Sequence, residues 1–362
     1  MKVLFISRST LFKDKGGDTV QVENTAAYLR KIDVSVDIRL CNDTIDYSGY
    51  DLLHFFNIIR PADILRHIEF SGKPYVVSTI YVDYSEYEKK ARGGFSGLIF
   101  KVIPADVIEY AKVVARFLIN GEKIVSPSYL ILGQRRAIQK IIRNAAMLLP
   151  NSKSEYERLT QHFNIKAHFK IIPNAVDPFL FRDPNSTVAR NPDLVICAGR
   201  IEGRKNQLNL IKALNNTRFK LVIIGSASTN QKKYFEACKA AAGPNVAFIG
   251  NLTQPELLEY YKIAKVHVLP SWFETTGLSS LESAMMGCNI VVTRKGDTEE
   301  YFENYAFYCE PESVQSIFTA IEKASSHTYE DTLRKKILTQ YTWIQTAEKT
   351  KAAYLELMQR HS

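Results

Sequence analysis

The chain has 362 residues, enough for two domains that each bury a core of their own. Hydrophobic residues make up 46% of it and charged residues 23%, a balance that is ordinary for globular proteins and excludes a disordered chain. No apolar run approaches the roughly 20 residues that cross a bilayer, and the first residues lead straight into a strand-like stretch rather than a signal peptide. We therefore expect a cytoplasmic protein.

The net charge of +9 is concentrated in one part of the chain. Residues 89–143 hold eleven Lys or Arg and three acidic residues, an excess of eight positive charges. Apolar residues are interleaved with these cations, as between Gly94 and Ile103. Charge and apolar bulk together are typical of a surface that docks on an anionic membrane; the alternative is a solvated basic helical face. Docking would make the protein peripheral at the inner face of the plasma membrane.

Cysteine and histidine spacing argues against disulfides and metal sites. The five cysteines are scattered without C-x-x-C spacing, which favours reduced, mostly buried thiols. None of the seven histidines has metal-ligand spacing, and His54 and His267 fall within strand-like runs. We expect these two in the core or at a sheet edge rather than in catalysis.

The first half opens as a strand, a glycine loop and a helix, which is the start of a doubly wound α/β domain. The strand candidate Lys2–Ser7 is followed by Gly16 and Gly17, where a ligand could approach the backbone, and by a helix-like run over residues 18–31. Further strands are predicted at Val34–Leu40, Leu52–Phe56, Tyr75–Thr79 and Ala146–Leu149. Helix-length segments or loops lie between most of them, which favours a mostly parallel sheet.

The alternation is interrupted by residues 89–143, predicted to be a basic, helical excursion. After it, Ser152 and Glu155 have the spacing of a capping box, and Phe169–Pro173 is predicted to be another strand. The polar residues 182–192 are interpreted as a linker. We predict a first domain over 1–182, a second over 183–342, and a terminal helix over 343–362 that could cross back to the first domain.

The second half repeats the architecture. Strands are predicted at Leu194–Gly199, Phe219–Gly225, Val246–Gly250, Val266–Leu269 and Asn289–Thr293, with a helix at Gln207–Leu214. Their carboxyl ends share one edge of the sheet, where ligands bind in open α/β domains. Arg200 and Lys205 follow the first of these strands beside a glycine, so we expect them to bind phosphate rather than serve as solvated loop charges.

Two carboxylates, Glu274 and Glu282, are separated by seven intervening residues near the end of this half. The turn-forming run Thr275-Thr276-Gly277 follows the first, and a helix-prone run carries the second. A helix N-terminus between them would offer backbone N–H groups to an anion. An anion cradle flanked by hydrogen-bond acceptors suits a sugar attached to a nucleotide diphosphate.

Four ordered segments resemble elements of the group 1 glycosyltransferases, retaining enzymes of the GT-B fold that use nucleotide sugars. Asn151–Glu157 resembles the S-x-x-E segment of that family, and Pro173–Asp177 resembles its I-P-N-G-V-D element. Ala198-Gly-Arg200 with Lys205 resembles its G-R-x4-K loop, and Glu274–Glu282 resembles its E-x7-E motif. The similarity runs from Met1 to about Tyr354.

The resemblance implies two Rossmann-like domains, each a doubly wound parallel sheet, that face each other across a cleft. The second would hold the donor and the first the acceptor. Arg200 and Lys205 would neutralise the diphosphate, Glu282 would accept hydrogen bonds from the ribose hydroxyls, and Glu274 would contact the transferred sugar. The remaining donor contacts would come from Thr276, Gly277, Leu278 and Ser279, with Gly16 and Gly17 closing from the first domain.

Two segments depart from the family pattern. Many relatives have a histidine after the strand that corresponds to Tyr75–Thr79, whereas this chain reads Ser78-Thr-Ile-Tyr-Val-Asp83, so Tyr81 or Asp83 is expected on the acceptor side. Relatives commonly read E-G-F-G-L where this chain has Glu274-Thr-Thr-Gly-Leu278. That change bears on how the far hydroxyls of the sugar are held.

The sequence thus predicts a glycosyltransferase that moves a sugar from a nucleotide diphosphate to a glycan or lipid-linked acceptor, in polysaccharide or lipopolysaccharide biosynthesis. The chain has no D-x-D triplet, so neither a metal nor another cofactor is expected. Alternatives are a sugar-nucleotide epimerase or a phosphorylase of the same fold. A non-enzymatic nucleic-acid-binding protein is a further alternative, which would leave Glu274 and Glu282 unexplained.

Overall fold

The computed structural model describes residues 1–83, 86–87, 107, 110–111, 126–182 and 189–360. The chain divides into two units. The first comprises residues 1–81, 88–174 and 343–362, and the second comprises residues 82–87 and 175–342. Most of the basic stretch 89–143 lies outside the described residues.

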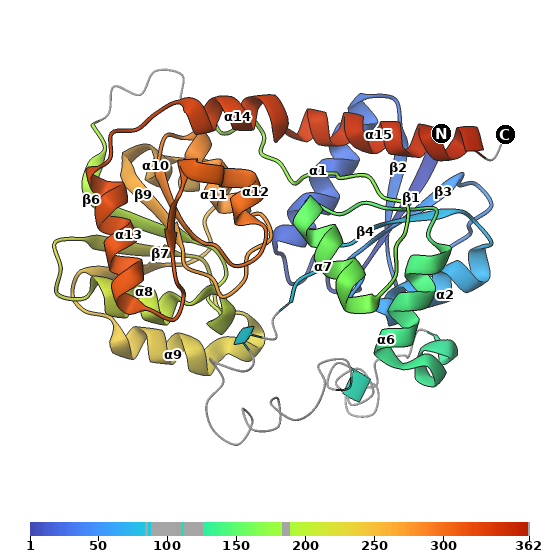
Figure 1. The fold of residues 1–362 in the computed structure, drawn as a ribbon, viewed down its shortest axis with the longest axis horizontal. Coiled ribbons are helices and arrows are strands. Elements are labelled where there is room, and N and C mark those ends of the chain that lie inside the picture. Colours follow the sequence, from blue (N-terminus) through green and yellow to red (C-terminus); the bar gives the residue numbers. More distant parts are fainter. Residues whose placement is uncertain (84–85, 88–106, 108–109, 112–125, 183–188, 361–362) are drawn as a thin grey trace. The chain divides into compact units, whose positions relative to one another are not determined.

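The first unit contains a parallel sheet with the strand order β2-β1-β3-β4-β5 (Figure 1). The strands are β1 (Lys2–Ser7), β2 (Ser35–Leu40), β3 (Leu52–Phe56), β4 (Tyr75–Ser78) and β5 (Met147–Leu148). Every residue of β3 and β4 is buried, which is why these strands read as continuous apolar runs in the sequence.

Five helices of this unit lie among the residues that the structure describes. They are α1 (Gly17–Lys31), α2 (Pro61–Ser71), α6 (Pro127–Asn144), α7 (Lys153–Phe163) and α15 (Trp343–Arg360). Helix α6 is kinked at Gly133, whose φ of 67° and ψ of 178° are not helical. Helices α1 and α15 pack side by side (Figure 1).

The C-terminal helix α15 is part of the first unit and is fixed there by buried polar contacts. The hydroxyl of Tyr354 lies 2.6 Å from Nδ1 of His54, whose Nε2 lies 2.8 Å from the Ser78 hydroxyl. Thr346 Oγ1 donates to the Pro173 carbonyl at 2.8 Å. Burial lowers the pKa of His54 to about 3, so the ring is neutral and acts as a structural link between β3, β4 and α15.

One local prediction for this unit is wrong, and a second is confirmed only in part. Phe169–Pro173 is not a strand: the segment runs beside β5, with one isolated bridge from Phe169 to Leu148, and prolines 150 and 173 limit the backbone donors there. Ser152 does cap α7 by accepting from Glu155 N at 2.9 Å. The carboxylate of Glu155, however, accepts hydrogen bonds from other residues. It accepts from Tyr81 N and Asn151 N, each at 2.8 Å, and from the Thr79 hydroxyl.

The second unit has a parallel sheet with the order β11-β10-β9-β6-β7-β8. Its strands are β6 (Asn191–Ala198), β7 (Lys220–Ile224), β8 (Val246–Ile249), β9 (Ala264–Leu269), β10 (Asn289–Thr293) and β11 (Phe307–Cys309). The α-helices are α8 (Gln207–Leu214), α9 (Lys232–Ala241), α10 (Gln254–Ile263), α11 (Leu278–Met285), α12 (Thr298–Phe302), α13 (Val314–Ser326) and α14 (Thr332–Gln340). The short 3-10 turns are η1 (Gly203–Lys205), η2 (Thr229–Gln231) and η3 (Glu303–Tyr305).

The two ends of the second unit's main segment meet. Val176 N donates to the Tyr341 carbonyl at 2.9 Å, and Val176 forms a parallel bridge with Thr342. The division after residue 174 therefore comes before the boundary that the sequence placed after residue 182. Strand β6 begins at Asn191, inside the stretch interpreted as a linker.

The core contains the thiols and histidines expected there. All five cysteines are free and buried, as predicted. His54 and His267 are 1% and 0% exposed, and burial also lowers the pKa of His267 to about 3. Among the described helices, none combines the length and apolar character that a bilayer crossing demands.

We predict that Tyr354→Phe destabilises the first unit by about 1–3 kcal/mol, because it leaves the buried Nδ1 of His54 without its partner while keeping the ring volume. Calorimetric unfolding measures the loss as a lower melting temperature. Tyr305→Phe, at a tyrosine that is 39% exposed, is the matched control. Equal melting temperatures for the two variants would contradict this account of α15.

Candidate active site in the second unit

The candidate site lies at the carboxyl edge of the second sheet. Strands β6 and β9 are neighbours in this sheet, so the loops that follow them, 199–206 and 270–277, meet at that edge. Trp272 N donates to the Arg204 carbonyl at 2.9 Å and joins the two loops directly. This edge is where open α/β sheets bind ligands.

The loop after β6 carries a compact group of charges. Glu202 is 6% exposed, and its Oε1 accepts from Arg204 Nε at 2.7 Å and lies 4.0 Å from Arg200 Nη2. Burial alone would raise the pKa of Glu202, but the two guanidinium groups outweigh it and lower that pKa. Glu202 therefore stays ionised and orients the two arginines at the edge of the sheet.

Asn206 fixes the end of this loop. Its φ of 63° is left-handed, a conformation that asparagine tolerates better than most residues. Its side-chain amide donates to the Pro270 carbonyl at 3.0 Å and to the Pro311 carbonyl at 2.6 Å. One buried side chain thus ties the loop after β6 to two other loops of the same unit.

Glu274 is held by its carboxylate. Its Oε2 accepts from Lys205 Nζ at 2.5 Å and from Ser271 Oγ at 3.0 Å. Only 8% of Glu274 is exposed, and the side chain of Lys205 is 21% exposed. Lys205, which we expect to bind phosphate, therefore contacts Glu274, which we expect to contact the sugar.

Glu274 is also held by its main chain. Its N–H donates to the Lys295 carbonyl at 3.0 Å, and its own carbonyl accepts from Asp297 N at 2.9 Å. Gly296 lies between these partners with a φ of 102°, and a Cβ there would collide with the Glu274 carbonyl. The turn after β10 can approach Glu274 this closely because residue 296 is glycine.

The N-terminus of α11 lies beside the loop after β6. The hydroxyl of Ser279, in the first turn of α11, donates to the carbonyl of Ala198, the last residue of β6, at 2.9 Å. No side chain among the described residues caps this helix, whose N-cap is Gly277 at a φ of 68°. The positive end of an eight-residue helix therefore points toward the loop that carries Arg200 and Lys205.

Glu282 lies three residues after Ser279 and so on the same face of α11. It is half-buried, and burial raises the pKa of its carboxyl to about 8. The pKa of the buried Tyr261 phenol is raised, mainly by burial and also by the Glu282 carboxyl nearby. In the unliganded protein Glu282 is thus mostly protonated at neutral pH.

The structure brings together most of the residues that the sequence indicated. Arg200, Lys205, Glu274 and the 276–279 segment meet at one edge, and Glu282 lies on the adjoining helix face. Gly16 is the N-cap of α1 in the first unit, with Gly17 next to it. Tyr81 is 5% exposed, with its ring 5.9 Å from that of Phe163, and Asp83 belongs to the short segment assigned to the second unit.

Sequence reasoning missed several residues that shape this edge: Glu202, Arg204, Asn206, Ser271 and Lys295. A usable signal existed for Glu202, which stands two residues from each of two arginines. Nothing in the local sequence indicates that Lys295 belongs here, because its place depends on the turn after β10 reaching Glu274.

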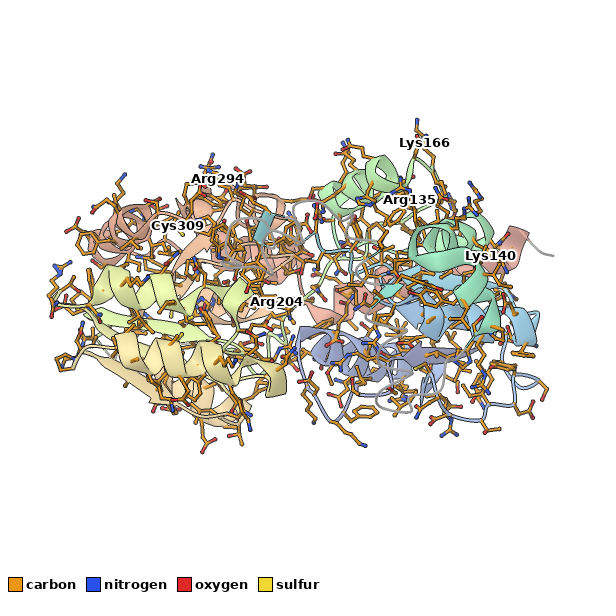
Figure 2. The ribbon with its side chains drawn as sticks, turned by 90° about the horizontal axis from the view of Figure 1, so that it is seen from below. Arg135, Lys140, Lys166, Arg204, Arg294 and Cys309 are labelled. Carbon is orange, nitrogen blue, oxygen red and sulfur yellow. The ribbon has the colours of Figure 1, made fainter. Side chains whose placement is uncertain are left out.

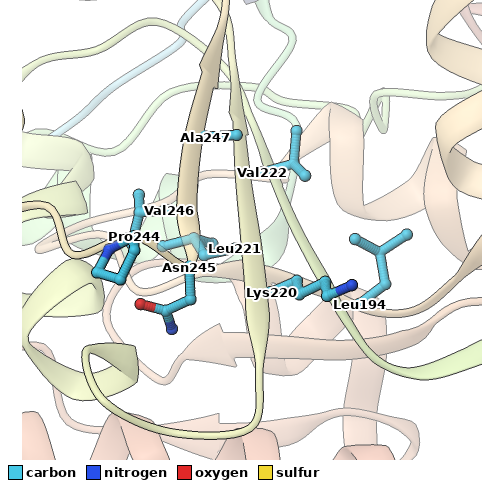
Figure 3. Close-up of a pocket in the computed structure, with 8 residues that line it drawn as sticks. All are labelled: Leu194, Lys220, Leu221, Val222, Pro244, Asn245, Val246 and Ala247. Carbon is cyan, nitrogen blue, oxygen red and sulfur yellow. The ribbon is translucent and has the colours of Figure 1, made fainter.

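A separate depression of about 460 Å³ lies away from the carboxyl edge of this sheet, along the amino-terminal halves of β6, β7 and β8 (Figure 3). Its walls are largely apolar, with Leu194, Leu221, Val222 and Val246 among them. Lys220 is the charged residue in its lining. It therefore lacks the grouped polar side chains of the carboxyl edge and is not the candidate site.

Residues 181–339 match the family described as "Glycosyl transferases group 1". A curated relative, the D-inositol 3-phosphate glycosyltransferase of Pseudarthrobacter chlorophenolicus, is 31% identical over 203 residues, which are 51% of this chain and 47% of the relative. The chain thus spans about half the length of the curated relatives that it matches first.

Solved structures with a similar fold cover nearly the whole chain. Sucrose-phosphate synthase from Thermosynechococcus elongatus superposes with a TM-score of 0.75 at 15% identity, covering 99% of this chain and 100% of that one. The Anabaena protein HepE in complex with UDP-glucose gives a TM-score of 0.70 at 16% identity, covering 98% and 100%. At these identities the likeness shows the fold, two Rossmann-like parallel-sheet units of the GT-B type.

We predict that Glu282→Gln removes a pH dependence from the stability of the second unit. Between about pH 4.5, the ordinary pKa, and about pH 8, the folded protein holds a proton that the unfolded chain releases, so stability falls as the pH rises through this window. Glutamine has no proton to release. The variant should exceed the wild type by about 1–3 kcal/mol near pH 8.5 and equal it near pH 4.5.

Thermal unfolding at a series of pH values measures this difference. Glu322→Gln, at an exposed glutamate on α13 of the same unit, is the control and should follow the wild type at every pH. A constant offset between Glu282→Gln and the wild type across the range would contradict the assignment of the proton to Glu282.

Proposed function

We propose that this chain, which has the GT-B fold and whose residues 181–339 match the group 1 glycosyltransferases, transfers a sugar from a nucleotide diphosphate donor to an acceptor hydroxyl with retention of anomeric configuration. The observation that carries the proposal is the joint placement of Lys205, Glu274 and the N-terminus of α11 at one edge of the second sheet. The donor would bind within this unit.

The diphosphate needs positive charge and hydrogen-bond donors, and this edge supplies both. Arg200 and Lys205 would neutralise it, and the first N–H groups of α11 would bind its oxygens. When the bond from the anomeric carbon to the diphosphate breaks, negative charge grows on the leaving oxygen. Donors that are already in place lower the barrier because they need no reorganisation at that moment.

Glu274 would accept hydrogen bonds from hydroxyls of the transferred sugar, and Glu282 from those of the ribose. In the unliganded protein Glu274 neutralises Lys205. An incoming diphosphate would compete for the ammonium group, which frees carboxylate lone pairs for sugar hydroxyls. The acceptor hydroxyl would then bond to the anomeric carbon while its proton passes to the departing diphosphate.

The donor is proposed to be a UDP-sugar, which the fold shared with the UDP-glucose complex of HepE supports. The acceptor is proposed to be a glycan or a lipid-linked sugar in surface polysaccharide or lipopolysaccharide synthesis. That assignment draws on the family resemblance and on the basic first unit. No group of three or more metal-ligating side chains occurs in the part of the chain that the structure describes.

Calorimetric titration with UDP-, GDP- and ADP-sugars, UDP-glucose first, tests the proposal. The wild type should bind one class, and Lys205→Ala should weaken that binding by about tenfold or more and suppress turnover while the protein stays folded. Lys212→Ala, at an exposed lysine of α8, should behave as the wild type. If no nucleotide sugar binds, is hydrolysed or is transferred, the proposed function is wrong.

We also propose that the first unit docks on an anionic membrane through α6. This helix carries Arg135, Arg136, Lys140 and Arg143 and has no acidic residue. The three arginines are exposed, and Figure 2 labels Arg135 and Lys140 on α6 together with Lys166 beyond α7. The rest of the basic stretch 89–143 is outside the described residues, so α6 is the part on which the proposal stands.

The first turn of α6 displays aliphatic side chains. Ile131 is 83% exposed and Leu130 is 41% exposed. The turn is anchored to the rest of the unit, since Tyr129 is fully buried and Ser128 Oγ donates to Glu69 Oε1 on α2 at 2.6 Å. Exposed aliphatic groups that precede the exposed arginines of the same helix suit the boundary between headgroups and acyl chains.

Sedimentation with vesicles of anionic or zwitterionic lipid measures docking. Neutralising Arg135, Arg136 and Arg143 to Gln should lower binding to anionic vesicles at low salt by about tenfold or more. Ile131→Ser should lower it without a change of charge.

The matched control neutralises three exposed lysines of the second unit, Lys232, Lys233 and Lys323, and so changes the net charge equally. The same loss of binding in the control and the α6 variant would show that net charge alone drives adsorption, and the docking proposal would fail.

A further inference from the structure

A short segment from the first half of the sequence belongs to the second unit. Residues 82–87 group with it, although residues 1–81 and 88–174 belong to the first. Within this segment Glu86 Oε1 accepts from Lys295 Nζ at 3.1 Å, and the ring of Tyr87 lies 6.3 Å from that of Trp272. Glu86 and Tyr87 thus contact the turn after β10 and the loop after β9.

Tyr87 fits against the loop that carries the phosphate-binding cations. A Cβ at Gly203 would collide with the phenol oxygen of Tyr87. Residue 203 is therefore a position where the absence of a side chain lets another segment approach. Trp272, the aromatic neighbour of Tyr87, is 7% exposed and hydrogen-bonds to the Arg204 carbonyl through its N–H.

Lys295 connects Glu86 to Glu274. Its carbonyl accepts from Glu274 N at 3.0 Å, and its own N–H donates to Thr293 Oγ1 at 3.1 Å. The side chain of Lys295 points to Glu86 while its main chain holds Glu274. Contacts that hold Lys295 in place, such as the one with Glu86, therefore also hold the backbone of Glu274.

We propose that Glu86 is a positioning residue for recognition of the transferred sugar, acting through Lys295 on Glu274. The inference rests on the proposed function, in which Glu274 contacts that sugar. The contacts of Glu86 given above lead through Lys295 to the backbone of Glu274, the residue proposed to contact the sugar. Their influence should therefore fall on the sugar part of the donor and spare the nucleotide part.

Because Glu86 and Lys295 are partly exposed, an effect of their removal on sugar binding can be told apart from an effect on folding stability. The side chains of Lys295 and Glu86 are 35% and 33% exposed, and ion pairs of such exposure contribute little to folding. Removing one partner should thus leave the fold intact. A selective effect on sugar binding would come from a shift of the turn that carries Glu274.

The experiment compares UDP with UDP-glucose, because only the second carries a sugar. Calorimetric Kd values are measured for the wild type, Glu86→Gln, Lys295→Met and the charge-reversed pair E86K with K295E. We expect Kd for UDP-glucose to rise about threefold to tenfold in each single variant, with Kd for UDP within about twofold of the wild type. The reversed pair should recover most of the loss.

The neighbouring ion pair is the matched control. Arg294 and Glu299 form a salt bridge beside the same turn, but their side chains are 53% and 55% exposed. Arg294→Met should leave both Kd values unchanged.

Two outcomes would overturn the proposal alone, and a third would overturn the proposed function as well. A UDP-glucose affinity unchanged in Glu86→Gln and Lys295→Met overturns the proposal, and so does an equal loss for UDP and UDP-glucose, since that marks a general structural defect. Failure of the wild type to bind UDP, UDP-glucose or the GDP and ADP counterparts overturns the proposed function and this inference with it. That failure is recognised before any substitution is made.

Discussion

The contact between Lys205 and Glu274 is the constraint around which the second unit's functional edge is built. Two ions with little exposure lose most of their hydration, so each needs the other and additional hydrogen bonds. Ser271 supplies one of these to the carboxylate. The pair forms because β6 and β9 are adjacent parallel strands, whose following loops reach the same edge. Sheet topology thus sets the charge pattern of the candidate site.

Two different acids balance the three cations of the loop after β6. Glu202 balances the arginines of the loop after β6, and Glu274 balances Lys205. The two acids differ in what a ligand would do to them. Glu202 lies among arginines within its own loop and can keep them oriented when a phosphate arrives. On the proposed function, Glu274 would share its cation with the incoming phosphate, so binding of the diphosphate would alter the hydrogen-bonding capacity of the sugar site.

Much of this could be predicted because buried parallel strands produce continuous apolar runs. The strands Leu52–Phe56 and Asn289–Thr293 have the predicted bounds, and so does the helix Gln207–Leu214. Where prediction went wrong, distant partners had overridden a local signal. Glu155 has the spacing of a capping box, yet its carboxylate accepts from residues more than seventy positions earlier. Such a choice depends on tertiary packing, which no local window contains.

The same limit explains why the surroundings of Glu274 could be read only in part. Its partners come from the loops after β6, β9 and β10, and the sequence indicated just one of them, Lys205. The phosphate side is built from one continuous loop and one helix start, which is why spacing reveals it. The sugar side is built from separate turns, with Glu86 reaching Lys295 from the first half of the chain. On the proposed function, changes in those turns would alter sugar recognition while the phosphate contacts stay in place, because structurally separable elements would hold the two parts of the donor.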